Sequence, residues 1–174
     1  FRVAFIASVV TVAIALVLLY LARLTGSPWI TGVNRVAALG YAVPGAVLAI
    51  GILIPLARFD NWLVAFVQLA FGVKPGLLLT GSIAALVYAY IVRFLAVALN
   101  TVESGFSRIT PHMDEAARSL GCGPWSLAQR VHAPMLSRSL VVAALLVFVD
   151  ALKELPATLA LRPFNFDTLA TQAY

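Results

Sequence analysis

Cysteine and charge are both scarce in this sequence. Its 174 residues include one cysteine, Cys122, so no disulfide can form within the chain, and no Cys/His cluster has metal-site spacing. We expect Cys122 to be a small packing residue. Charged residues make up only 11%, whereas soluble domains carry about a quarter. Hydrophobic residues make up 62%, more than a water-soluble fold of this size can cover, so the composition predicts a membrane protein.

Several other patterns are also missing. The net charge is +5, but the arginines are scattered singly and form no basic stripe, which favours loops beside a membrane over nucleic-acid binding. The alternation of barrel strands is absent, and so is the G-x-x-x-x-G-K-[ST] loop, so we expect no ATP site and no enzyme. The chain begins at Phe1 inside a hydrophobic run, without a signal-peptide pattern, and we expect it to be a piece of a longer protein.

Four apolar stretches are long enough to cross a bilayer: 3–22, 36–57, 77–99 and 140–157. At about 1.5 Å per residue, a helix of roughly 20 residues covers the approximately 30 Å hydrocarbon layer. A fifth stretch, 62–73, is too short, and we predict an interfacial or re-entrant helix there. Backbone groups in lipid must be satisfied within each segment, so the predicted fold class is all-α, a polytopic helical membrane protein.

Arginine placement predicts the orientation. The loops 23–35 and 100–138 are expected on one side, with six basic residues against four on the other, which places them in the cytoplasm. Arg93 is then expected near the cytoplasmic end of its span, where a long side chain can snorkel. His112 and His132 flank the polar part of the second loop, and both are expected at the surface.

The sequence of that polar part predicts two short helices joined at a sharp bend. Thr110 can cap a helix that begins at Pro111, and Gly121 supplies a left-handed stop. A second short helix is predicted from Trp125 to about residue 132, before Pro134. Helices this short are not stable alone and need a surface to pack against. One interpretation is a connector that lies on the bilayer, with Trp125 as an interfacial anchor.

A second interpretation comes from a resemblance. Glu115-Ala116-Ala117, followed by Gly121 and then by Val131-His132-Ala133-Pro134, resembles the "EAA" signature of inner-membrane permease subunits of binding-protein-dependent ABC importers. The usual ending is Ile-x-Leu-Pro, so Val131 and Ala133 depart from it. The resemblance implies a MetI-like transmembrane bundle with a coupling-helix hairpin, residues 111–134, that docks on a cytoplasmic ATPase. The coupling residues it implies are Asp114, Glu115, Ala116, Ala117, Leu120, Gly121 and Pro134.

The fourth span carries three charged residues, Asp150, Lys153 and Glu154, near its far end. Asp150 and Glu154 are four apart and therefore share a helix face, and ionisable groups at this depth are costly. One hypothesis makes them a translocation path, because carboxylate oxygens suit a hard cation such as ferric ion. The other makes them a structural ion pair between Lys153 and a carboxylate. Neither gives a complete metal site.

Two further stretches, "KELPATLALRPFNFDTLA" and "GYAVPGAVLAIGILIPLA", resemble ferric-iron permeases. Such permeases usually carry two related halves, so the resemblance implies that residues 1–174 form one transmembrane permease domain, most of a second half without its last span. The implied partners are ATPase subunits that bind the ATP, a periplasmic binding protein, a second permease half or copy, and lipid, with no nucleic acid and no cofactor. Other cargoes (thiamine, sulfate, molybdate or a polyamine) stay open, as do a membrane enzyme using Asp150, Lys153 and Glu154 as acid–base groups, and a scaffold.

Overall fold

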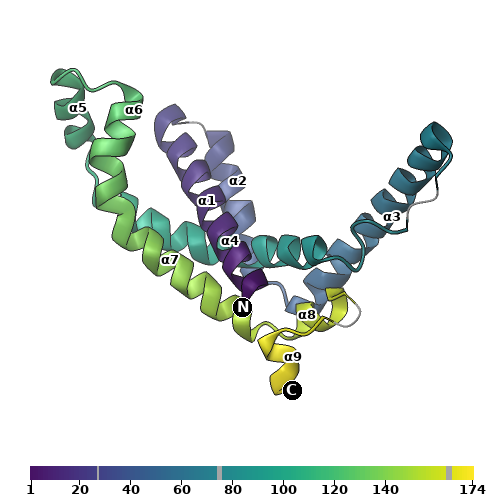
Figure 1. Cartoon of the computed structure of the whole chain (residues 1–174). Helices are drawn as coiled ribbons and strands as arrows, with labels where there is room; N and C mark the ends of the chain where they lie inside the picture. The colour runs from purple at the N-terminus through teal and green to yellow at the C-terminus, as the bar shows by residue number, and fades with distance from the viewer. Residues whose placement is uncertain (27, 74–75, 164–165) are drawn as a thin grey trace.

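The computed structural model describes residues 1–26, 28–73, 76–163 and 166–174, and within these ranges every regular element is helical. This confirms the predicted all-α class. In chain order the elements are α1 (Arg2–Thr25), α2 (Pro28–Ala38), the 3₁₀ turn η1 (Leu39–Tyr41), α3 (Gly45–Phe71), α4 (Ile83–Phe106), α5 (Pro111–Ser119), α6 (Pro124–Leu127), the π-turn η2 (Ala128–His132), α7 (Ala133–Lys153), α8 (Pro156–Leu161) and α9 (Leu169–Ala173) (Figure 1).

Four helices in the described part are long and apolar enough to cross a membrane: α1, α3, α4 and the continuous helix Trp125–Lys153. The existence of four spans is confirmed, but several predicted bounds are wrong. The third span, predicted at 77–99, is Ile83–Phe106, and the fourth, predicted at 140–157, is Trp125–Lys153. The bounds of the second span are also wrong. It begins at Gly45 rather than at residue 36, because α2 and η1 occupy the preceding residues and Pro44 is the N-cap of α3. Apolar runs alone do not mark such breaks between helices.

The separate short helix predicted at 62–73 is also wrong, because α3 continues without a break to Phe71 and ends at Gly72, whose φ is +68°. The polar pair at residues 60 and 61 had suggested a loop. Asp60 is instead fully buried, and its carboxylate accepts hydrogen bonds from the backbone N–H groups of residues 78–80 at 2.8–3.0 Å. The charge therefore holds the segment that leads into α4 against the middle of α3.

The core is built where α1, α4 and α7 pack together. Their contact faces carry fully buried alanines, namely Ala7, Ala15, Ala89, Ala98 and Ala143. Small side chains let helices approach closely in lipid, where packing rather than the hydrophobic effect holds helices together. At Gly105 the helices α4 and α7 come so close that no side chain fits between them, because a Cβ added there would lie 2.6 Å from the Ser139 hydroxyl oxygen on α7.

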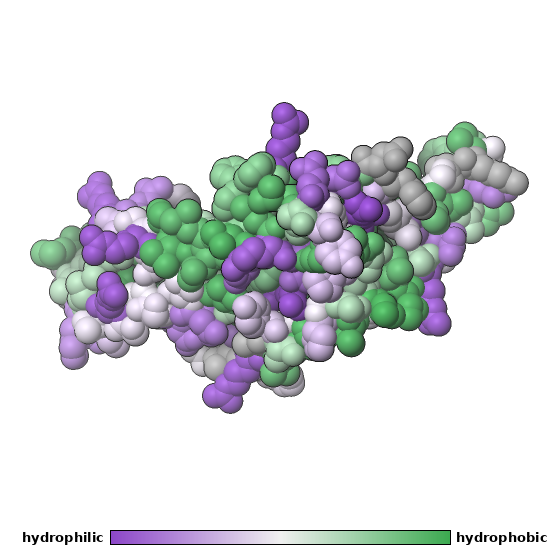
Figure 2. All heavy atoms as spheres, turned by 90° about the horizontal axis from the view of Figure 1, so that it is seen from below, coloured by the Kyte–Doolittle hydropathy of each residue, from purple (hydrophilic) through white to green (hydrophobic). Residues whose placement is uncertain are grey.

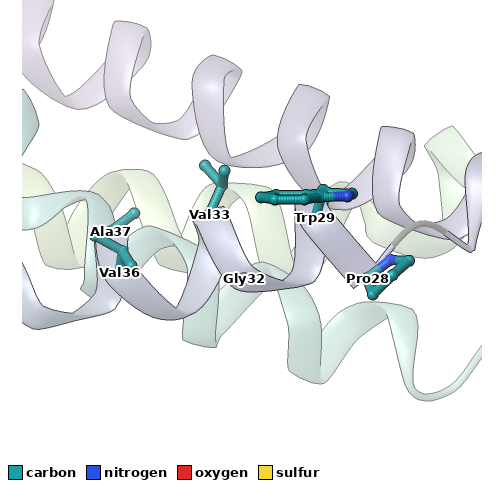
Figure 3. A pocket seen from close by; sticks show the side chains of 6 residues that line it. All are labelled: Pro28, Trp29, Gly32, Val33, Val36 and Ala37. Carbon is teal, nitrogen blue, oxygen red and sulfur yellow. The ribbon is translucent and has the colours of Figure 1, made fainter.

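The outward faces of these helices remain apolar. Phe5 and Val17 on α1, and Val141 and Leu145 on α7, are exposed, and Figure 2 shows wide hydrophobic areas open on one face of the molecule. Helix α2 also carries an open apolar groove of about 610 Å³, shown in Figure 3 and lined by Pro28, Trp29, Gly32, Val33, Val36 and Ala37. A surface of this kind suits lipid as the surrounding solvent, in agreement with the composition.

Candidate functional site

The first arm of the hairpin forms as the sequence predicts. Thr110 occupies the N-cap of α5 and Pro111 its first turn, although the Thr110 side chain makes no capping hydrogen bond. Gly121 has φ +81°, the left-handed conformation that ends helices, and the Cys122 N–H donates to the Ala117 carbonyl at 3.0 Å. The α5 helix lies at one end of the molecule beside α6 (Figure 1).

The second arm differs from the prediction of a short helix ending before Pro134. Helix α6, η2 and α7 run on as one helix, with Pro134 inside it. Because proline has no N–H, the carbonyl four residues earlier loses its usual partner, and the helix widens there. The Ala133 N–H bonds the Ala128 carbonyl, five residues back, as in a π-turn. The hairpin is thus continuous with a membrane span.

Asp114 points inward and joins three segments. One carboxylate oxygen accepts hydrogen bonds from Arg23 Nη2 at 2.9 Å and Arg23 Nε at 3.1 Å, and the other lies 2.9 Å from His132 Nε2. Arg23 Nη2 also donates to the Ile109 carbonyl at 2.9 Å. We call Arg23, Asp114 and His132 the hairpin anchor. It ties the end of α1 to the hairpin, so the two lie on one side of the bundle, as expected.

The anchor keeps Asp114 ionised. Burial of the carboxyl by itself raises its pKa, but the hydrogen bonds from His132 and Arg23, together with the charge of the Arg23 guanidinium, outweigh burial and hold the Asp114 pKa below its ordinary value. The expectation that His132 lies at the surface is wrong: its side chain is 3% exposed and meets the rings of Tyr20 and Phe106 edge-on, at 5.7 and 6.4 Å between centroids. His112, in contrast, is exposed as expected.

The other coupling residues divide between two faces of α5. Glu115 and Ala116 are exposed, and Leu120, just beyond the helix, is 85% exposed. Ala117, in contrast, is buried. Together with His112 and Ser119 the exposed residues recur at i, i+3, i+4, i+7 and i+8, the spacing of a single helix face. We call His112, Glu115, Ala116, Ser119 and Leu120 the outer face of the hairpin. Gly121 and Pro134 shape the hairpin through the bend and the π-turn.

The three charged residues of the fourth span do not form one cluster, because Asp150 pairs with Lys153 and Glu154 pairs with Arg93. Helix α7 ends at Lys153, and Glu154 has an extended backbone with ψ 102°, so the expectation that Asp150 and Glu154 share a helix face is wrong. The break falls at Glu154, two residues before Pro156, which has no N–H to bond the carbonyl of residue 152 and begins α8 as its first residue. Lys153, whose side chain is 68% exposed, lies 3.4 Å from Asp150. The predicted pairing of Lys153 with a carboxylate is therefore present, through Asp150.

Glu154 has a different partner. Its Oε2 accepts a hydrogen bond from Arg93 Nε at 2.9 Å, and Arg93 Nη1 donates to the Val43 carbonyl at 2.7 Å. The prediction that Arg93 snorkels to the cytoplasmic end is wrong, since Arg93 lies in the middle of α4 and is largely buried. The pair ties α4 to the α7–α8 junction and to the start of α3, where a Cβ on Gly45 would lie 2.3 Å from Glu154 Oε1.

Asp150 alone of the two carboxylates opens onto a groove. Tyr41, Asn100 and Thr101 line this groove of about 420 Å³ together with Asp150, and their side chains offer oxygen atoms. In the part of the chain that the structure describes, no three Asp, Glu, His or Cys side chains come close enough to hold a metal ion.

Comparisons with known proteins find relatives that are named as transport permeases. No family model matches it. It is 25% identical over 170 residues to the Fe(3+)-transport system permease protein FbpB 2 of Haemophilus influenzae, covering 98% of this chain and 30% of that one. It is 30% identical over 141 residues to the probable ABC transporter permease protein y4fN of Sinorhizobium fredii, an alignment that covers 79% of this chain and 22% of that one. It is 29% identical over 118 residues to the trehalose transport system permease protein SugB of Mycobacterium tuberculosis, covering 68% of this chain and 42% of that one. The chain thus spans less than half the length of each.

Proposed function

This multi-pass protein of the bacterial inner membrane is related to the permease subunits of binding-protein-dependent ABC transporters, and we propose on that premise that its 111–134 hairpin docks a separate cytoplasmic ATPase. The chain would then be part of the membrane pore of an importer, together with a second permease half or copy. A periplasmic binding protein would deliver the cargo.

The observation that carries this proposal is the division of α5 into two faces. Its inner side is fixed to α1 through Asp114, while Glu115, Ala116 and Leu120 are presented outward. The second arm continues directly into α7, so a displacement of the hairpin moves a membrane span with it. An ATPase that contacts the outer face differently in its nucleotide-bound and empty states can shift the conformation of the spans in this way.

Two variants test the docking. Leu120→Asp places a charge at the highly exposed end of the outer face, whereas Ser107→Asp adds the same charge to an exposed residue of the preceding turn. Both variants are expected in the membrane at normal amounts. Co-purification of the ATPase subunits with the complete transporter, and ATP-driven uptake, should fall at least tenfold for Leu120→Asp only. Equal co-purification of the two variants would exclude the outer face as the docking site.

For the cargo we propose ferric iron. The support is the relative named as an Fe(3+)-transport permease, which aligns with 98% of this chain, and the oxygen-bearing groove around Asp150. Hard cations prefer oxygen ligands. Another relative is named for trehalose, so permeases related to this chain differ in what they carry.

Within this pathway proposal Asp150 contributes a side-chain oxygen that faces the groove, while Glu154 is bound by the buried Arg93 and acts as a structural group. The same pairing weakens the membrane-enzyme hypothesis, which required Glu154 as an acid–base group. Asp150→Asn is expected to lower ferric-iron uptake several-fold while the protein stays in the membrane. Normal iron uptake by that variant would show that Asp150 is not part of the path. Uptake of a different cargo, and not of iron, by the intact transporter would contradict ferric iron as the cargo.

A further inference from the structure

A groove runs between α1 and the second arm of the hairpin, and His132, which binds Asp114, is one of the residues that line it. It has a volume of about 280 Å³ and is lined mainly by apolar side chains, among them Leu16 and Leu21 of α1, Ala128 of η2 and Leu140 of α7. Trp125, whose side chain is 75% exposed, stands among the lining residues. Among the described residues that line the groove, none is a lysine or an arginine.

Two polar atoms in this lining lack hydrogen-bond partners. His132 Nδ1 and the Tyr20 hydroxyl oxygen are both buried, and neither has a partner among the described residues. Leaving buried polar atoms unsatisfied is unfavourable, so native structures rarely do so. Because Asp114 is ionised and only accepts, the His132 nitrogen that faces it carries the hydrogen. In the neutral ring Nδ1 therefore offers a lone pair and needs a donor, while the Tyr20 hydroxyl can donate.

The position of the groove indicates what fills it. It is flanked by exposed apolar residues of two membrane spans, Val17 on α1 and Val141 on α7, which face lipid. Tyr20 lies about 7.5 Å along the axis from the end of α1, and Trp125 is a residue type typical of the membrane–water boundary. An occupant with a long apolar part and a polar end at this depth is a phospholipid of the same leaflet.

We propose that this groove binds a phospholipid whose headgroup carries an N–H or O–H donor. One acyl chain lies along the apolar lining, the headgroup donates to His132 Nδ1, and the Tyr20 hydroxyl donates to an ester or phosphate oxygen. With no cationic side chain in the lining, selection depends on the donor of the headgroup rather than on its negative charge. Since the same imidazole binds Asp114, an occupied groove also restrains the hairpin anchor.

Native mass spectrometry of the delipidated full chain tests this with three dioleoyl lipids. Phosphatidylethanolamine offers an ammonium donor, phosphatidylglycerol a hydroxyl donor, and phosphatidylcholine neither. The proposal predicts that the first two are retained about fivefold more than phosphatidylcholine, the effect of roughly one hydrogen bond. Retention of phosphatidylglycerol alone would show that charge selects the lipid, and it would overturn the proposed donor role.

Four variants locate the binding. Ala128→Phe fills the groove and should abolish selective retention, whereas Leu145→Phe, on a lipid-facing position of α7 outside the groove, should not. His132→Phe keeps an aromatic ring against Tyr20 and Phe106 but has no acceptor nitrogen, and it should erase the preference over phosphatidylcholine. Tyr20→Phe removes one unpartnered oxygen without disturbing the fold, and should weaken retention a few-fold. Equal retention of all three lipids, or selective retention that survives Ala128→Phe, would overturn the proposal.

Discussion

Arg23, in the last turn of α1, donates two hydrogen bonds to one carboxylate oxygen of Asp114, in the first turn of α5. The contact joins a membrane span to the hairpin, and it also places a negative charge near the positive end of the α5 dipole. Asp114 was grouped with the ATPase-contacting residues on the basis of sequence. In the structure it fixes the direction in which the hairpin points.

Loss of the anchor should destabilise the protein measurably. Asp114→Asn keeps the size of the side chain but removes its charge, so the charge-assisted hydrogen bonds from Arg23 and His132 weaken, at an expected cost of about 2 kcal/mol. Glu115→Gln is the matched control, since Glu115 is 70% exposed and its neutralisation should cost less than about 0.5 kcal/mol. Thermal unfolding in detergent compares the two. Equal unfolding temperatures for both variants would contradict the role of the anchor.

The anchor also predicts a pH dependence. The pKa of Asp114 is lower in the folded protein than its ordinary value, so the ionised carboxylate stabilises the folded state at neutral pH. That contribution is complete above about pH 5 and is lost as the pH falls below about 4, toward the folded pKa. The difference in unfolding temperature between the wild type and Asp114→Asn should therefore shrink between pH 5 and pH 3. A constant difference would show that protonation of Asp114 is not involved.

Glu154 and its neighbour Lys153 should respond differently to the loss of their charge. Glu154→Gln leaves Arg93 buried without its carboxylate and should cost about 3 kcal/mol. Lys153→Gln removes an exposed partner of Asp150 and should change stability by less than about 1 kcal/mol. Unfolding of the two variants in the same detergent provides the comparison. A larger loss for Lys153→Gln would mean that the buried pair is not the one that matters.

Two glycines make a matched test of close packing. A Cβ on Gly40 would lie 2.3 Å from the Val92 carbonyl oxygen, a backbone atom that can move only with α4, whereas a Cβ on Gly51 meets nothing within 4 Å. Gly40→Ala should therefore lower the unfolding temperature by several degrees. Gly51→Ala, inside α3, should leave it unchanged or raise it, because alanine favours helix. Similar shifts for the two would contradict the close approach of η1 to α4.

Much of the fold could be predicted from the sequence, because apolar length and proline or glycine signals are local. Four spans, the start of α5 at Pro111 and the left-handed Gly121 all depend on neighbouring residues. The errors arise where a distant partner decides the outcome. Asp60 resembled a loop marker, but the backbone of residues 78–80 satisfies it, which lets α3 continue.

The same limit applies to the site. The outer face could be predicted from the spacing of Glu115, Ala116 and Leu120, but the inward direction of Asp114 could not, because Arg23 and His132 lie far from it in sequence. Arg93 and Glu154 likewise find each other only in the folded chain. The one local signal for the buried His132 is its place two residues before Pro134, inside the π-turn.

Site-specific cross-linking tests the central claim most directly. With the native Cys122 replaced by serine, Ala116→Cys places a thiol on the outer face, and Ala117→Cys places one at the adjacent buried position. In membranes containing the complete transporter, a short bifunctional reagent should join residue 116 to the ATPase subunit and leave residue 117 unlinked. The absence of any ATPase cross-link from residue 116, with the variant present and transporting normally, would contradict the assignment of this hairpin as the docking element.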